Sequence, residues 1–177
     1  KMRLLRNHGI RKPTNHQSPI TNHPSWYQEM IDLGYNYRIT DIQAALGLSQ
    51  LKKLDKFLRR RRQITLQYIT AFEKNDEIIL PPHRDWADHA WHIFPIQFKT
   101  LSRDKIYTNL LNQGIKCQVH YLPIHLHPYY QKKLGYRKGD FPNAEKYFSR
   151  CLTIPLFPAM DKKMVNKVIR EITKLTS

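Results

Sequence analysis

The sequence lacks the short motifs that mark many nucleotide-binding and hydrolytic enzymes. Its six glycines are scattered, and none forms the GxGxxG or GxxxxGK loop that holds phosphate groups. The GxSxG turn of serine hydrolases, the HExxH zinc motif and a zinc-type Cys/His spacing are also absent. The function therefore has to be inferred from other features of the chain.

Long apolar runs and cysteines are scarce as well. No segment approaches the roughly 18 apolar residues of a membrane span, and the first residues are not a signal peptide. The two cysteines, Cys117 and Cys151, have no CxxC spacing. We expect a cytoplasmic protein that does not enter the membrane and whose thiols are reduced, with a single disulfide as the alternative.

Acidic residues are few, 14 against 30 Lys and Arg, which gives a net charge of +16. Such a balance suits nucleic acid, an anionic membrane or phosphorylated small molecules as partners. Much of the charge lies between Lys52 and Arg62, where a solvated helix face is the default and a nucleic-acid-binding helix the alternative. The 177 residues, 41% of them hydrophobic, are enough for one globular domain with or without an appendage.

One long helix is expected near the middle of the chain. Before it, residues 13–25 contain three prolines and indicate an irregular crossing segment. Thr40 followed by Gln43 has the pattern of a capping box, which begins a helix. Apolar residues then recur every three or four positions without a proline, which predicts a single helix over about 41–74.

Short strands and helices follow this helix. Strands are expected over 91–98, 115–119 and 152–155, and Pro95 indicates an edge position for the first of them. Helices are expected over 102–112, 129–134, 143–149 and 161–175. The order predicts an α+β fold, in which a long helix precedes a short three-stranded sheet with helices on one side.

The loop over residues 120–128 is rich in histidine. His120, His125 and His127 could together bind a metal ion, but no carboxylate or thiolate companion lies nearby. Tyr121 and the neighbouring prolines favour a stiff His/Tyr wall for a substrate, so no metal is expected. A polar surface loop is the remaining alternative.

Asn36 and Arg38 lie between two tyrosines just before the expected helix. Amide and guanidinium groups beside a helix N-terminus suit an anion such as phosphate or carboxylate. The alternative is that Asn36 is a turn residue and Arg38 a surface charge.

The segment DLGYNYRITDIQAALGLSQL, residues 32–51, resembles the signature that opens the C-terminal domain of DegT/StrS-type sugar-nucleotide aminotransferases. Three further segments resemble other parts of that family, in the family's order: residues 6–9, 119–125 and 141–145 followed by 154–156. The resemblance covers essentially the whole chain. Within the family, the chain is most similar to the UDP-sugar 4-aminotransferases of the pseudaminic acid route.

The resemblance implies the C-terminal small domain of the aspartate-aminotransferase (type I) fold and a homodimeric enzyme. Such enzymes use pyridoxal 5'-phosphate to move an amino group from glutamate to a UDP- or dTDP-linked keto sugar. By resemblance, Asn36 would bind the cofactor phosphate of the partner subunit. Arg38, His120, Tyr121 and His125 would bind the substrate.

The chain departs from the family in one respect, because no lysine lies in a context like that of the Schiff-base lysine. The resemblance implies that residues 1–33 are the tail of the large cofactor domain with a crossing segment and that 34–177 form the small domain. We therefore expect a C-terminal fragment or separately encoded half that is inactive alone and contributes no catalytic residue. The alternatives are a non-catalytic remnant and a basic nucleic-acid-binding module that uses residues 52–62.

Overall fold

The computed structural model describes residues 1–12, 27–84 and 86–176. The irregular crossing expected over 13–25 lies outside these residues. The chain forms two compact units, Lys1–Lys53 and Leu54–Ser177, which are described separately.

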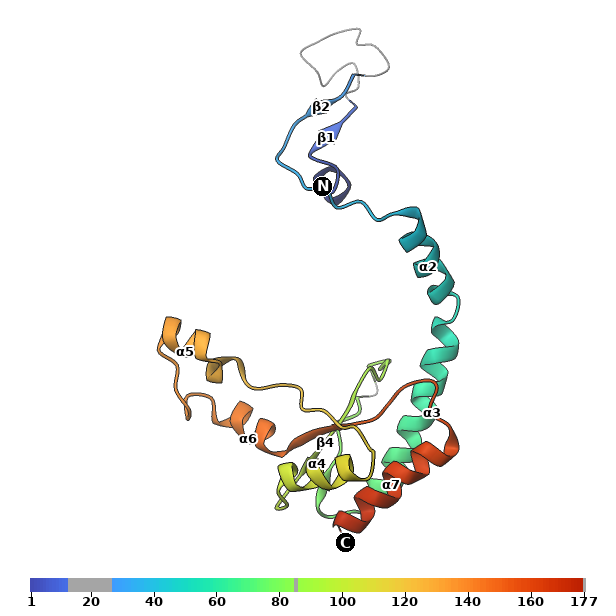
Figure 1. Ribbon diagram of the computed structural model, residues 1–177, viewed down its shortest axis with the longest axis vertical. Coiled ribbons are helices and arrows are strands. Elements are labelled where there is room, and N and C mark those ends of the chain that lie inside the picture. Colours follow the sequence, from blue (N-terminus) through green and yellow to red (C-terminus); the bar gives the residue numbers. More distant parts are fainter. Residues whose placement is uncertain (13–26, 85, 177) are drawn as a thin grey trace. The chain divides into compact units, whose positions relative to one another are not determined.

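The N-terminal unit contains two helices and a small antiparallel ribbon (Figure 1). Its elements are α1 (Met2–Leu5), β1 (Ile10–Arg11), β2 (Glu29–Met30) and α2 (Asp41–Leu51), with Ile10 opposite Met30 in the ribbon. The expected capping box is confirmed at the start of α2. The Gln43 amide N–H donates to Thr40 Oγ1 at 3.3 Å, and the Thr40 N–H donates to Gln43 Oε1 at 2.9 Å.

The expectation of one unbroken helix is wrong. The helix ends at Leu51, and α3 (Leu54–Phe72) begins after a two-residue turn in which the Lys53 N–H donates to the Gln50 carbonyl. No residue of α2 is buried, whereas α3 buries one face against a core. The regular spacing of apolar residues therefore continues through both helices, although only α3 buries its apolar face.

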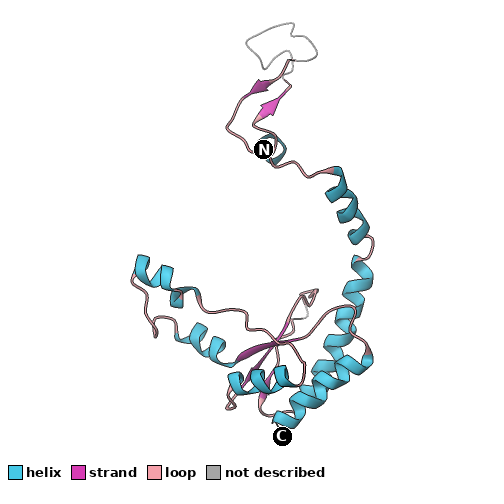
Figure 2. Ribbon diagram, in the orientation of Figure 1, coloured by secondary structure: helices cyan, strands magenta, loops and turns pink. Residues whose placement is uncertain are grey.

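The C-terminal unit is built on a three-stranded antiparallel sheet, which confirms the α+β fold (Figure 2). Its order is β3 (Ile78–Ile79), β4 (Phe94–Phe98), β5 (Cys151–Ile154). The sequence did not indicate β3, and the strand expected over 115–119 is wrong. In that segment Ile115 and Cys117 are buried in alternation, but only Gln118 pairs with β5. The alternation reflects burial without a hydrogen-bonded ladder.

The edge position expected for β4 is also wrong, because β4 is the middle strand. Pro95 is tolerated there for a local reason. It lies opposite Thr153, whose N–H and carbonyl both bond to Gln118 on the far side. Thr153 therefore makes no backbone bond to Pro95, and the pairing of β3 reaches only Gln97 and Phe98.

The remaining helices follow the sequence closely. They are α4 (Arg103–Asn112), the 3-10 turn η1 (Ile124–Leu126), α5 (Pro128–Leu134), α6 (Pro142–Arg150) and α7 (Lys162–Thr176). Ser102 caps α4 by accepting from the Lys105 N–H at 3.4 Å, and Asp161 Oδ1 accepts from the Met164 N–H at 2.7 Å. Among the described residues, no helix combines the length and apolar character needed to cross a bilayer.

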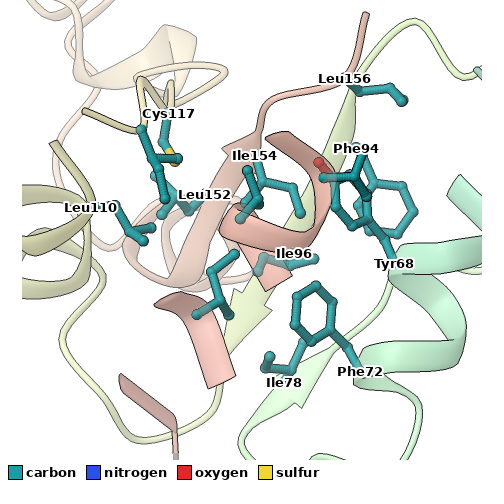
Figure 3. Packing of buried hydrophobic residues seen from close by; sticks show 14 of the residues in the cluster. Tyr68, Phe72, Ile78, Phe94, Ile96, Leu110, Cys117, Leu152, Ile154 and Leu156 are labelled. Carbon is teal, nitrogen blue, oxygen red and sulfur yellow. The ribbon is translucent and has the colours of Figure 1, made fainter. Parts of the chain in front are cut away.

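The core lies where α3, α4 and α7 pack on one face of the sheet (Figure 3). Tyr68 of α3 contacts Phe72 on the same helix and Phe94 of β4, and none of the three side chains has exposed surface. The buried Tyr68 hydroxyl donates to the Pro155 carbonyl at 2.7 Å, and burial raises the pKa of this phenol. Cys117 and Cys151 are buried and free, as expected for reduced thiols, and burial raises the pKa of Cys117 to about 12.

Candidate functional site

In the N-terminal unit, two segments that resemble separate family motifs pack against each other. Residues 34–38 run antiparallel to residues 5–8, with a bridge between Asn7 and Asn36. The two segments are joined by backbone hydrogen bonds: His8 N–H to Tyr35 O (2.9 Å), Tyr35 N–H to Leu5 O (2.6 Å) and Tyr37 N–H to Arg6 O (2.9 Å). The two motifs therefore form one structural piece.

Two glycines allow this close approach. Gly9 has φ +68°, and a Cβ there would lie 1.8 Å from the Asp32 carbonyl oxygen. A Cβ on Gly34 would lie 2.2 Å from the Gly9 nitrogen. Both contacts are with backbone atoms, which cannot turn aside as a side chain can. The positions of Asn36 and Arg38 therefore depend on glycine at residues 9 and 34.

Asn36 and Arg38 present hydrogen-bond donors on this piece. Arg38 Nη1 donates to Asn7 Oδ1 at 2.6 Å, which fixes the guanidinium and leaves its other N–H groups available. The Asn36 side chain is exposed and has no partner among the described residues. Tyr35 and Tyr37 stack with ring centroids 4.9 Å apart. The arrangement suits a bound anion.

The N-terminus of α2 contributes less to such a site than the sequence suggested. The capping box already occupies the Gln43 N–H, and the Gln43 side chain occupies the Thr40 N–H. An anion here would depend mainly on the side chains of Asn36 and Arg38.

In the C-terminal unit, the structure brings His120 and Tyr121 together beside β5. His120 Nδ1 lies 2.9 Å from the hydroxyl of buried Thr153, and this contact orients the imidazole. The Tyr121 ring lies 4.7 Å from the His120 ring, and 73% of Tyr121 is exposed. This pair offers one oriented imidazole and one accessible phenol.

His125 is buried, unlike Tyr121. It is only 5% exposed, and its Nε2 lies 2.9 Å from Glu145 Oε1 on α6. The same carboxylate oxygen accepts the Gly139 N–H at 2.7 Å, and the imidazole packs on Phe141. These contacts join the segment before α5 to the segment after it, so the geometry favours a structural role for His125. Its contact with a substrate stays a prediction. Among the described residues, no three potential ligands form a metal-binding group.

The His125–Glu145 contact predicts a pH effect on stability. The hydrogen bond with His125, followed by the Gly139 N–H, lowers the pKa of Glu145 below its ordinary value. A lowered folded-state pKa stabilises the fold above the unfolded pKa of about 4.3, and this contribution is lost as the pH falls through the folded pKa. The stability difference between the native chain and Glu145→Gln should therefore shrink below about pH 4 in denaturant titrations. Glu73→Gln, on an exposed carboxylate, is the control, and a pH-independent difference for Glu145→Gln would contradict the assignment.

Three supporting residues were not identified as such from the sequence. Asn7 and Glu145 lie within segments that resemble the family, but nothing in their spacing indicates that they hold Arg38 and His125. Thr153 is a buried strand residue, and no sequence signal connects it with His120.

Arg60, Arg61 and Arg62 of α3 do not form a solvated face, whereas Lys52, Lys53, Lys56 and Arg59 are exposed, as expected. Arg61 Nη1 donates to the carbonyls of Trp91, His92 and Leu156 at 2.9–3.1 Å. Arg60 donates to the Met160 carbonyl, and Arg62 pairs with Asp88. This part of the expectation is wrong, because the guanidinium groups reach loops that lie far away in the sequence.

Similar proteins agree with the resemblance in the sequence. The Bacillus subtilis spore coat polysaccharide biosynthesis protein SpsC is 40% identical over 97% of this chain and 45% of its own length. A Campylobacter jejuni UDP-4-amino-4,6-dideoxy-N-acetyl-beta-L-altrosamine transaminase is 36% identical over 92% of this chain and 41% of its own length. The chain thus spans less than half of these relatives.

A solved structure confirms the fold. Helicobacter pylori PseC, an aminotransferase involved in the biosynthesis of pseudoaminic acid, superimposes with a TM-score of 0.82 and 27% identity, covering 99% of this chain and 45% of that chain. The pattern of the DegT/DnrJ/EryC1/StrS aminotransferase family matches residues 1–173. The chain therefore belongs to the DegT/DnrJ/EryC1/StrS aminotransferase family and corresponds to its C-terminal portion.

Proposed function

We propose that this chain is the C-terminal part of a pyridoxal-phosphate-dependent aminotransferase that moves an amino group from glutamate to a UDP- or dTDP-linked keto sugar. The observation that carries the proposal is the packing of residues 5–9 against 34–38. It holds Arg38 through Asn7, and the Asn36 amide has no side-chain partner among the described residues. The Campylobacter relative, named as a transaminase of an amino sugar nucleotide, supports the substrate class.

The exposed donors fit the phosphate end of pyridoxal phosphate. Phosphate oxygens are strong acceptors, and the Asn36 amide supplies N–H donors without an intrachain partner among the described residues. When bound, the cofactor supplies the electron-accepting ring that amine transfer requires. Within the proposed homodimer, Asn36 would bind the phosphate at the partner's site.

Arg38 would orient an acidic group of the substrate. A guanidinium binds a carboxylate or phosphate through paired N–H donors, and the bond to Asn7 reduces the freedom that Arg38 loses on binding. His120, Tyr121 and His125 would form the sugar-nucleotide wall, with His120 oriented by Thr153. Tyr121 is the most accessible of the three and offers a hydroxyl and a flat face.

The same proposal assigns residues 1–33 to the tail of the large domain and 34–177 to the small domain. No lysine of the chain lies in a segment that resembles the cofactor-holding lysine of the family. After incubation with pyridoxal phosphate and removal of the unbound cofactor, the purified chain should therefore retain no visible absorption band. A stable yellow adduct that borohydride fixes at one lysine would contradict this.

The proposed reaction can be tested by supplying the missing portion. The chain would be co-purified with the N-terminal portion of the Bacillus subtilis relative, and glutamate-dependent amine transfer to a panel of UDP- and dTDP-linked keto sugars would be measured. We expect transfer only with both portions present. A folded, co-purifying pair that transfers no amine to any member of the panel would favour the non-catalytic remnant.

A further inference from the structure

A basic and apolar groove lies along the first half of α3, within the C-terminal unit. Its volume is about 910 Å³, and it is bounded by α3, by Ala90 and His92, and by residues 157–159. Apolar side chains form much of its lining, including Phe57, Leu58 and Phe157. Leu54 and Phe157 at the groove are 45% and 40% exposed. The groove therefore leaves apolar surface in contact with water.

Four cations line the groove, and among the residues that the structure describes no carboxylate does. Arg60 and Arg61 are bonded to backbone carbonyls and hold the groove wall in place. Lys56 and Arg59 differ, because both are exposed and neither side chain has a partner within the described part of the chain. They lie three residues apart on α3 and therefore project from the same side of the helix.

We propose that this groove binds an acidic amphipathic helix of another protein. Apolar residues at helical spacing would cover Phe57, Leu58 and Phe157, while carboxylates one turn apart would pair with Lys56 and Arg59. The proposal does not rest on the aminotransferase proposal, because none of these residues belongs to the candidate sites around Asn36 or His120.

Charge and chemistry favour this occupant over others. A nucleic acid needs free cations for its phosphates, whereas Arg60, Arg61 and Arg62 are bonded inside the unit. A free nucleotide would leave most of the apolar lining uncovered. An acidic amphipathic helix can pair its carboxylates with the free cations and cover the apolar lining with its apolar face.

The test is a fluorescence anisotropy titration of the full chain with a labelled peptide. The probe is a helical peptide of about 18 residues, five turns, with Leu on one face and Glu beside it. We expect saturable binding that weakens with rising ionic strength. Reversal of both free cations, Lys56→Glu with Arg59→Glu, should weaken binding by at least about tenfold. The affinity of a Lys56→Gln, Arg59→Gln variant should lie between that of the native chain and that of the charge-reversal variant.

The matched control carries the same change in net charge outside the groove. Lys132→Glu with Lys138→Glu, at exposed positions on and after α5, should leave the affinity within about twofold, because neither lysine nor its chain neighbours line the groove. Circular dichroism would establish that all variants are folded. Equal losses in the two reversal variants, or undiminished binding of a Gln-for-Glu peptide, would overturn the proposal. The proposal would also be overturned if an oligonucleotide bound the chain more tightly than the peptide and the groove substitutions abolished that binding.

Discussion

Gly34→Ala should open the N-terminal unit, because the new methyl group would overlap the Gly9 nitrogen and the His8 carbonyl carbon. The backbone bonds that join residues 5–8 to 34–38 would then break together. Amide hydrogen exchange should detect the loss of these hydrogen bonds. Protection of the His8, Tyr35 and Tyr37 amides should fall by about 100-fold, which corresponds to about 2.7 kcal/mol of local stability.

Gly47→Ala is the matched control for this change. Gly47 lies inside α2, and a Cβ there would meet nothing within 4 Å. The same substitution should therefore stabilise α2 by roughly 0.5–1 kcal/mol, since alanine is the better helix former. If Gly34→Ala left the three amides protected, the close crossing of the two segments would be wrong.

Arg61→Ala should produce the largest loss of stability among the surface arginines of α3. The guanidinium joins three carbonyls from two separate segments, residues 91–92 and residue 156. Trp91, held in this way, has φ +50° and is only 5% exposed. Removal of the cation should lower the free energy of unfolding by about 3 kcal/mol, because hydrogen bonds from a charged donor are the stronger ones.

Arg59→Ala, two residues earlier on the same helix, is the control for Arg61. Its side chain has no partner among the described residues, so the change should cost less than about 0.5 kcal/mol. Arg61→Lys should recover only part of the loss, since an ammonium group cannot reproduce the planar donor geometry. Equal effects of the Arg59 and Arg61 substitutions in urea titrations would refute the role given to Arg61.

Local sequence rules were sufficient for the capped helices. Thr40 and Asp161 accept the expected hydrogen bonds, and α4, α6 and α7 begin within two residues of their expected positions. Each of these features is decided within a few neighbouring residues. The family resemblance also identified residues 6–9 and 34–38 as parts of two separate motifs, but it did not indicate that they pack together.

Features that depend on distant contacts were missed. The break between α2 and α3 follows from where the buried stripe begins, and β3 exists because a two-residue segment pairs with the end of β4. The partners of Arg61 and His125 are separated from them by long stretches of sequence. Periodicity and propensity describe a segment and its burial, and they do not identify the segment on which it packs.

The central claim is that this chain supplies Asn36 to a pyridoxal phosphate site completed by the N-terminal portion of the family. Its most direct test is the affinity of the cofactor for the reconstituted pair, measured with the native chain, with Asn36→Ala and with Asn112→Ala on α4 as a control. Loss of a hydrogen bond to a charged group should weaken binding by about 10- to 100-fold for Asn36→Ala alone. An unchanged affinity for Asn36→Ala, or an equal loss for Asn112→Ala, would contradict the claim.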